Sequence, residues 1–249
     1  MDLGLSGRAA IVTGGSRGIG RAIAKLLASE GVDVAICARQ RQALEETAKA
    51  LSHETNRRII PIVADTMSSE SVAQLVDATV RTFGRIDVLV NNASTPGGMV
   101  RGPLAEADDK TLLEDIDTKV VGYLRCAKAV APHMQQRRWG RIVNIGGLSG
   151  RRSGNISGLR NDAIVHLTKT LADELGAHGI TVNLVHPGPT RTERTDAETE
   201  RRAASNAIRR MVDASEIAQV VTFLASTKAA NVTGVVIDAS GGSIPVIFQ

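Results

Sequence analysis

A glycine-rich turn near the start of the chain constrains the fold more than any other stretch. It reads Thr13-Gly14-Gly15-Ser16-Arg17-Gly18-Ile19-Gly20 and stands between an apolar run at residues 9–12 and a helical pattern of apolar residues at 19–27. Its glycines let the backbone turn sharply and approach a ligand, while the N–H groups that open the helix direct partial positive charge at an anion. The pattern predicts a bound phosphate or pyrophosphate, held by Gly14, Ser16, Arg17, Gly18, Ile19 and Gly20. A turn from strand to helix that binds no ligand is the alternative.

The end of the next apolar strand indicates which dinucleotide would bind. Residues 32–38 form a β-branched run, and a helical pattern follows. In a doubly wound sheet, an acidic residue at the end of the second strand holds the ribose 2′-OH, whereas an arginine nearby accepts a 2′-phosphate. This chain has Ala38 followed by Arg39. Together with Arg17, Arg39 favours NADP(H) over NAD(H), although either arginine taken singly is equally consistent with a solvated surface charge.

Polar residues follow two later strands. Asp65 ends the run at 59–64, and Asn91-Asn92-Ala93 ends the run at 86–90. Strands that alternate with helices predict right-handed crossovers and a parallel sheet, whose ligand crevice lies beyond the carboxyl ends of the strands. We therefore expect Asp65, Asn91 and Ala93 at the cofactor site. A simple Asx turn at the asparagines is the alternative.

Bulk properties favour one domain, residues 1–249, of a cytoplasmic protein. The chain has 249 residues, 43% hydrophobic, and no linker or repeat divides it. No apolar run approaches the ~20 residues of a membrane span, and the start does not resemble a signal peptide. Cys37 and Cys126 lack metal-ligand spacing and are expected to be buried thiols, so no metal is predicted. A formal charge of +4 with 2% aromatic residues argues against nucleic-acid binding.

Further motifs extend the pattern along the whole chain, which resembles a short-chain dehydrogenase/reductase of the 250-residue type. The matching segments are Thr13 to Gly20, Asp65, Asn91-Asn92-Ala93, Arg141-Ile142-Val143-Asn144-Ile145, His166-Leu167-Thr168-Lys169, Val182-Asn183, Pro187-Gly188, Val232-Thr233-Gly234 and Gly241-Gly242. The resemblance implies a Rossmann-type α/β fold: a doubly wound, parallel, seven-stranded sheet with three helices on each face. It also implies cofactor contacts at Pro187, Gly188 and Thr190, and a homodimer or homotetramer built on long helices at about 109–136 and 156–178.

The resemblance fails at the residues that handle the proton in that family. Its members use a Tyr as acid/base, a Lys four residues later, a Ser that polarises the substrate oxygen, and an Asn on the preceding helix. Alignment on the neighbouring motifs puts Ser157 at the Tyr position, Asn161 at the Lys position, Gly147 at the Ser position and Lys119 at the Asn position. All four depart from the pattern. Lys119 and Asn161 look exchanged, so an ammonium would reach the site from the opposite wall; a solvated Lys119 without a role is the alternative.

The altered set leaves several roles open. Asn161 is predicted to bind ribose hydroxyls without supplying a charge, and Ser149, Ser153 and Ser157 are candidates either for holding a substrate oxygen or for capping loops. The only tyrosine, Tyr123, is interpreted as a packing residue. His186 is expected near the pocket floor. Lys119, Ser157 and Asn161 are the predicted catalytic residues.

The segment at 190–210 stands where the family has its substrate lid, and it is rich in Arg and Glu. A charged lid fits a small polar or anionic substrate, but the charges are also consistent with the solvated face of a helix. The leading hypothesis is an NADP(H)-dependent oxidoreductase that interconverts a carbonyl and an alcohol. The rival is a dinucleotide-binding module without turnover, acting as a sensor or as the silent partner of an active homologue.

Overall fold

Seven parallel strands form the centre of the molecule in the computed structural model, which describes residues 2–100, 102–150 and 155–244. The strands are β1 (Ala9–Thr13), β2 (Asp33–Ala38), β3 (Ile59–Val63), β4 (Val88–Asn91), β5 (Gly140–Ile145), β6 (Ile180–Pro187) and β9 (Val236–Ala239). Their order is β3-β2-β1-β4-β5-β6-β9. This order confirms the predicted doubly wound sheet. Strands are added on one side of β1 up to β3 and then on the other side from β4 onward, so the switch point lies between β1 and β4.

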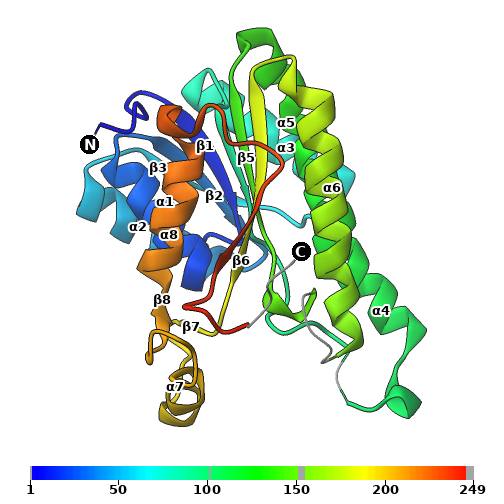
Figure 1. The fold of residues 1–249 in the computed structure, drawn as a ribbon. Coiled ribbons are helices and arrows are strands. Elements are labelled where there is room, and N and C mark those ends of the chain that lie inside the picture. Colours follow the sequence, from blue (N-terminus) through cyan, green and yellow to red (C-terminus); the bar gives the residue numbers. More distant parts are fainter. Residues whose placement is uncertain (1, 101, 151–154, 245–249) are drawn as a thin grey trace.

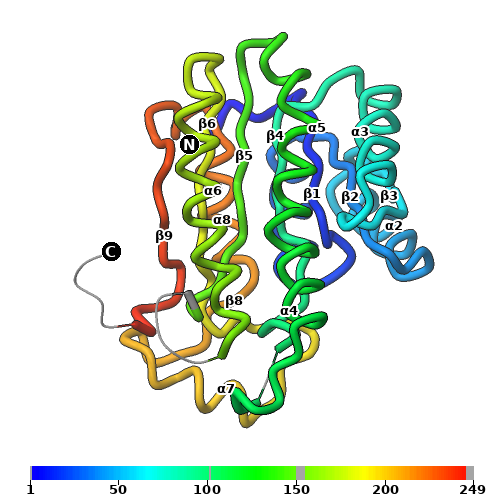
Figure 2. Tube along the Cα trace, turned by 90° about the vertical axis from the view of Figure 1, so that its right-hand side faces the viewer, coloured from blue at the N-terminus to red at the C-terminus, as the bar shows by residue number. Residues whose placement is uncertain are grey.

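Helices cover both faces of this sheet, as Figures 1 and 2 show. The helices α1 (Gly18–Ser29), α2 (Arg41–Thr55) and α8 (Ala214–Ala225) share one apolar core, which includes Ile23, Leu27 and Val221. The helices α3 (Ser69–Phe83), α5 (Gly122–Arg137) and α6 (Leu159–Gly176) share the other. The central strands are buried on both faces, which explains why they read as continuous apolar runs rather than as alternating ones.

The long helix expected at 109–136 is not uniform. It consists of α4 (Asp109–Ile116), a π-helical turn (Asp117–Val121) and α5. A π turn inserts one extra residue into the helical ladder and often marks a functional position; here it contains Lys119. The second long helix, expected at 156–178, starts as a 3₁₀ turn (Ile156–Gly158) and continues as α6 to Gly176. Two further 3₁₀ turns, Leu104–Glu106 and Leu148–Gly150, lie in the loops before these helices.

The lid segment carries a small second sheet that the sequence does not predict. Strand β7 (Thr190–Arg191) pairs with β8 (Val212–Asp213), and α7 (Ala197–Ala203) lies between them in the chain, at the lower edge of Figure 1. Arg191 is bonded to Asp213 at 2.6 Å and also to Glu200. Several lid charges thus pair with one another, as on a solvated surface.

The two cysteines are buried, as expected. Cys37 lies in β2 and Cys126 in α5, and burial raises the pKa of the Cys37 thiol to about 12. Among the described residues, no group of three or more His, Cys, Asp or Glu side chains could hold a metal ion. None of the helices in the described part of the chain is long and apolar enough to cross a bilayer.

Candidate active site

The glycine turn is held in place by the residue that follows β4. Gly14 and Gly18 have φ angles of 65° and 56°, which an L side chain rarely adopts. The side-chain amide of Asn92 donates to the carbonyls of Thr13 at 2.9 Å and Gly14 at 3.2 Å. A Cβ at Gly20 would lie 2.3 Å from the Gly14 oxygen. The turn therefore requires its glycines, and Asn92 locks its shape.

The neighbouring Asn91 is bonded to the framework of the sheet. Its side chain is fully buried, and its amide nitrogen donates to Asn144 Oδ1 at 2.9 Å and to the Tyr123 carbonyl at 3.3 Å. These bonds tie β4 to β5 and α5, and a cofactor contact at Asn91 stays a prediction. The hydroxyl of Thr13 accepts from the N–H groups of Asn92 and Ala93, at 2.9 and 3.0 Å. This brings Ala93 to the glycine turn, as expected.

The two arginines predicted to select NADP(H) lie beyond the carboxyl ends of β1 and β2, and both are exposed. Arg17 is the residue before α1, and Arg39 follows β2. Between them, the Ser16 carbonyl accepts a hydrogen bond from the Thr47 hydroxyl at 2.8 Å. Ile19 is half-buried in the first turn of α1 and packs on the core. Both guanidinium groups are free of ion pairs among the described residues.

The other predicted cofactor residues lie after β3 and at or just beyond the end of β6. The Asp65 carboxylate accepts from the Met67 N–H at 3.0 Å and so forms a local turn. Pro187 ends β6 opposite Ala239, and the Gly188 N–H donates to the Ala239 carbonyl at 3.3 Å. The Thr190 hydroxyl donates to the Gly188 carbonyl at 2.8 Å.

Lys119 points into the protein, not into solvent. Only 2% of its surface is exposed, and its ammonium donates to the Gly146 carbonyl and to Asn161 Oδ1, both at 2.8 Å. Burial lowers the pKa of Lys119 well below its usual 10.5; the charge of Arg160 lowers it further, and Asp115 opposes the shift. The two residues that the neighbouring motifs predict to be exchanged are therefore in direct contact.

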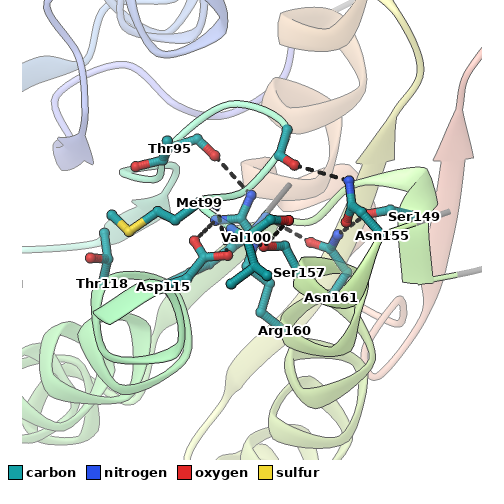
Figure 3. A network of polar contacts seen from close by, with 12 residues as sticks. Thr95, Met99, Val100, Asp115, Thr118, Ser149, Asn155, Ser157, Arg160 and Asn161 are labelled. Atoms are coloured by element: carbon teal, nitrogen blue, oxygen red, sulfur yellow. Dashed lines mark hydrogen bonds and ion pairs between the residues drawn. The ribbon is translucent and has the colours of Figure 1, made fainter. Parts of the chain in front are cut away.

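Asn161 extends this contact across the site. It is 2% exposed, and its amide nitrogen donates to the Ser149 hydroxyl at 2.7 Å. Lys119, Asn161 and Ser149 thus form a hydrogen-bonded chain from the π turn to the loop after β5; Figure 3 shows the Asn161–Ser149 part. Of the other loop serines named as candidates, Ser153 lies outside the described residues.

Ser157 is covered by the loop after β4. It is 1% exposed, and its hydroxyl lies between the Val100 N–H at 3.0 Å and the Val100 carbonyl at 3.4 Å (Figure 3). Gly98 lies so close that a Cβ there would be 2.2 Å from the Ser157 Cβ. The loop thus uses the hydrogen bonds of this hydroxyl, and a catalytic role for Ser157 stays a prediction.

A buried ion pair that sequence reasoning missed holds the same loop. Arg160 donates to Asp115 at 2.5 Å and to the Thr95 carbonyl at 2.8 Å, and both charged side chains are at most 4% exposed. The second Asp115 oxygen accepts from the Met99 N–H at 3.2 Å. Figure 3 shows these groups converging between α4 and the start of α6. The loop at 95–100 is therefore fastened to both helices.

Tyr123 and His186 have structural partners. Tyr123 is buried beside Ile164 and Leu184, and its hydroxyl donates to the Ile145 carbonyl at 3.0 Å, which confirms it as a packing residue. Burial raises the pKa of its phenol above the usual 10. His186 is fully buried, and its Nδ1 accepts from the Gly147 N–H at 2.8 Å.

A parallel sheet with a glycine turn at its switch point defines a dinucleotide-binding α/β protein. Residues 14–243 match the profile described as enoyl-(acyl carrier protein) reductase. The chain is 36% identical to the 3-oxoacyl-(acyl-carrier-protein) reductase of Haemophilus influenzae, over 96% of this chain and 98% of that protein. It is 35% identical to the peroxisomal 2,4-dienoyl-CoA reductase of Danio rerio, over 96% of this chain and 82% of that protein.

Solved structures give the same result. L-sorbose reductase from Gluconobacter frateurii, complexed with NADPH and L-sorbose, superposes with a TM-score of 0.92 at 28% identity, over 99% of this chain and 100% of that chain. The protein belongs to the short-chain dehydrogenase/reductase family, whose members are NAD(P)-dependent oxidoreductases.

Proposed function

We propose that the protein is an NADP(H)-dependent oxidoreductase that interconverts a carbonyl and an alcohol on a small polar substrate. In this proposal Lys119 takes over the proton-handling role of the family's tyrosine. One observation carries the proposal: the ammonium of Lys119 lies buried just beyond the carboxyl end of β5, 2.8 Å from the Gly146 carbonyl and 2.8 Å from Asn161 Oδ1. An unpaired charge is costly to bury. A lysine at such a buried position therefore favours a role in proton handling over a substitution without function.

The residues at the sheet edge fit a dinucleotide. A Cβ at Gly14, Gly15 or Gly20 would collide with neighbouring atoms, so the backbone of the turn stays bare at these positions. Helix α1 begins without a capping side chain of its own, so its first N–H groups suit a pyrophosphate. Arg17 and Arg39 would hold the 2′-phosphate by charge-assisted hydrogen bonds. Asn161 would reach the ribose hydroxyls. When bound, the nicotinamide supplies or accepts the hydride.

Lys119 would hold and move the proton. A protonated lysine has three donors, and the described residues give it two acceptors, the Gly146 carbonyl and Asn161 Oδ1. The third N–H would donate to a substrate oxygen during reduction, and the neutral amine would accept that proton during oxidation. A lowered pKa suits this task, because a general acid works best when its pKa is near the working pH.

The named relatives reduce carbonyl or unsaturated compounds carried on acyl-carrier protein or CoA, or a sugar. The charged lid at 190–210 supports a polar or anionic substrate for this chain. The test is a panel of carbonyl compounds and alcohols followed by NADPH absorbance, with NADPH and NADH affinities measured by calorimetry. Turnover with any substrate, together with tighter NADPH binding, is the expected result; tight binding without turnover on the panel would count against it.

A second candidate function is a dinucleotide-binding module without turnover. The observation in its favour is that the loop at 95–100 occupies the hydrogen-bonding groups of Ser157 and Arg160. Lys119 and Asn161 likewise bond to each other. A protein that only binds its cofactor has no need of access to these groups, whereas a reductase must open the loop. The same panel and titration separate the two functions.

A further inference from the structure

A carboxylate from the lid lies on the glycine turn. The backbone N–H of Gly18 donates to Glu193 Oε2 at 3.2 Å, although the two residues are 175 positions apart in the sequence. The preceding residue is also close: a Cβ at Gly18 would lie 3.5 Å from the Thr192 methyl group. Two consecutive lid residues therefore approach the turn at the start of α1.

Like the start of α2, the start of α1 has neither a side-chain cap nor an acidic residue in its first turn, whereas several other helix starts are capped. Ser68, Asp108 and Asp196 each accept a hydrogen bond from the first turn of α3, α4 and α7. In α1 the corresponding residue is Arg17, without a capping bond, and the first turn has no acidic residue. Helix starts are stabilised by negative charge, because their first N–H groups lack partners within the helix. Glu193 supplies this charge from outside.

We propose that Glu193 is an internal competitor of the cofactor's pyrophosphate, so that dinucleotide binding displaces Glu193 and loosens the lid from the glycine turn. The inference rests on the proposed dinucleotide binding at this turn. A carboxylate and a pyrophosphate seek the same N–H group and repel each other. The cofactor must therefore replace the Glu193 contact, and the returning lid would favour cofactor release.

The test compares Glu193→Gln and Glu193→Ala with the wild type, with Glu198→Gln as the matched control. Glu198 is an exposed acid on the same lid, and it forms an ion pair with Arg202 on the next helical turn. We expect both Glu193 variants to bind NADPH about two- to fivefold more tightly than wild type in low salt, the size of a charge effect at a helix start. Glu198→Gln should bind as wild type does.

Adenosine 2′-monophosphate separates the possible failures, because it carries the 2′-phosphate but no phosphate on the 5′ side, where the pyrophosphate is attached. Its affinity should be the same in wild type and in the Glu193 variants. Equal NADPH affinities, or weaker binding by the variants, would overturn the competition while leaving the proposed function in place. Failure of wild type and variants alike to bind either ligand would overturn the proposed function, and the competition with it.

Displacement of the lid has its own readout. Inorganic pyrophosphate probes the glycine turn alone, and trypsin can cut the lid at Arg201 and Arg202 on the exposed face of α7. We expect pyrophosphate to speed this cleavage in wild type. In Glu193→Ala, cleavage should already be fast and should not respond. A wild-type rate that pyrophosphate leaves unchanged would contradict the coupling.

Discussion

The ammonium of Lys119 and the side-chain oxygen of Asn161 lie 2.8 Å apart, joining the π turn before α5 to the first turn of α6. The neighbouring motifs predict an Asn and a Lys at these two positions in the family, so the contact joins the two members of a predicted exchange. The Asn161 amide oxygen and the Gly146 carbonyl accept hydrogen bonds from the ammonium, which supports a lysine buried at 2% exposure. This contact underlies the first two predictions.

Replacing Lys119 by Met is expected to lower kcat by about 100-fold or more on any substrate found, because a positioned general acid contributes about 10²- to 10⁴-fold. NADPH affinity should change much less. Lys128→Met is the control, since Lys128 is an exposed lysine on α5. Steady-state kinetics check the prediction. Full activity of Lys119→Met would exclude the lysine as the proton donor.

The stability of the protein should depend on pH through Lys119. Its pKa is well below 10.5 when folded, so between these two values the unfolded chain binds a proton that the folded protein does not. The free energy of unfolding should therefore rise with pH across this window, and the burial penalty should be largest below the folded-state pKa. Urea unfolding from about pH 7 to about pH 10 measures it. Lys119→Met should lack this rise; identical pH profiles would contradict it.

Arg39→Asp is expected to weaken NADPH binding by about ten- to a hundredfold, because a hydrogen bond to a charged group contributes about 1.5–3 kcal/mol. NADH binding should fall little or improve, since an acidic residue there suits a free 2′-OH. Arg41→Gln is the control: Arg41 is exposed and pairs with Glu45. Calorimetric titration with NADPH and with NADH measures the two affinities in each variant. An unchanged preference in Arg39→Asp would refute the assignment.

Removing either partner of the Asp115–Arg160 pair should destabilise the protein by about 3–5 kcal/mol, because the remaining buried charge loses its partner. The double variant Asp115→Leu with Arg160→Met should recover much of this loss. Disrupting the exposed Glu198–Arg202 pair should cost less than about 1 kcal/mol. Urea unfolding gives the values. A single-variant loss as small as that of the surface pair would contradict the structural role.

A homodimer or homotetramer built on α5 and α6 remains a prediction. On these two helices the apolar residues Val130, Ile164 and Leu171 are buried within the single chain. Leu124 on α5 is 43% exposed and is available to a partner. Leu124→Glu should therefore yield monomers in light scattering at micromolar concentration.

The control for the oligomer is Phe223→Glu on α8. Phe223 is 41% exposed and lies on a helix that packs on the opposite face of the sheet. This variant should keep the native oligomer. A wild-type protein that is monomeric would end the prediction, and an oligomer broken only by Phe223→Glu would move the interface to the other face.

The sequence by itself determined the glycine turn, the alternation of strands and helices, and the buried cysteines. These features depend on residues within one or two turns of each other, where periodicity and backbone preference act directly. It also located Lys119 and Asn161 as an exchanged pair, because both positions follow from neighbouring motifs.

Only the tertiary structure decided which of these groups meet. That Lys119 bonds to Asn161, that Arg160 and Ser157 hold the loop at 95–100, and that Glu193 reaches Gly18 depends on how helices pack on the sheet. The sequence separations in these contacts range from 42 to 175 residues. Nothing in the local pattern around Ser157 indicates that its hydroxyl binds Val100 rather than a substrate. Side-chain partners at such distances are chosen by packing and burial, which a linear pattern does not encode.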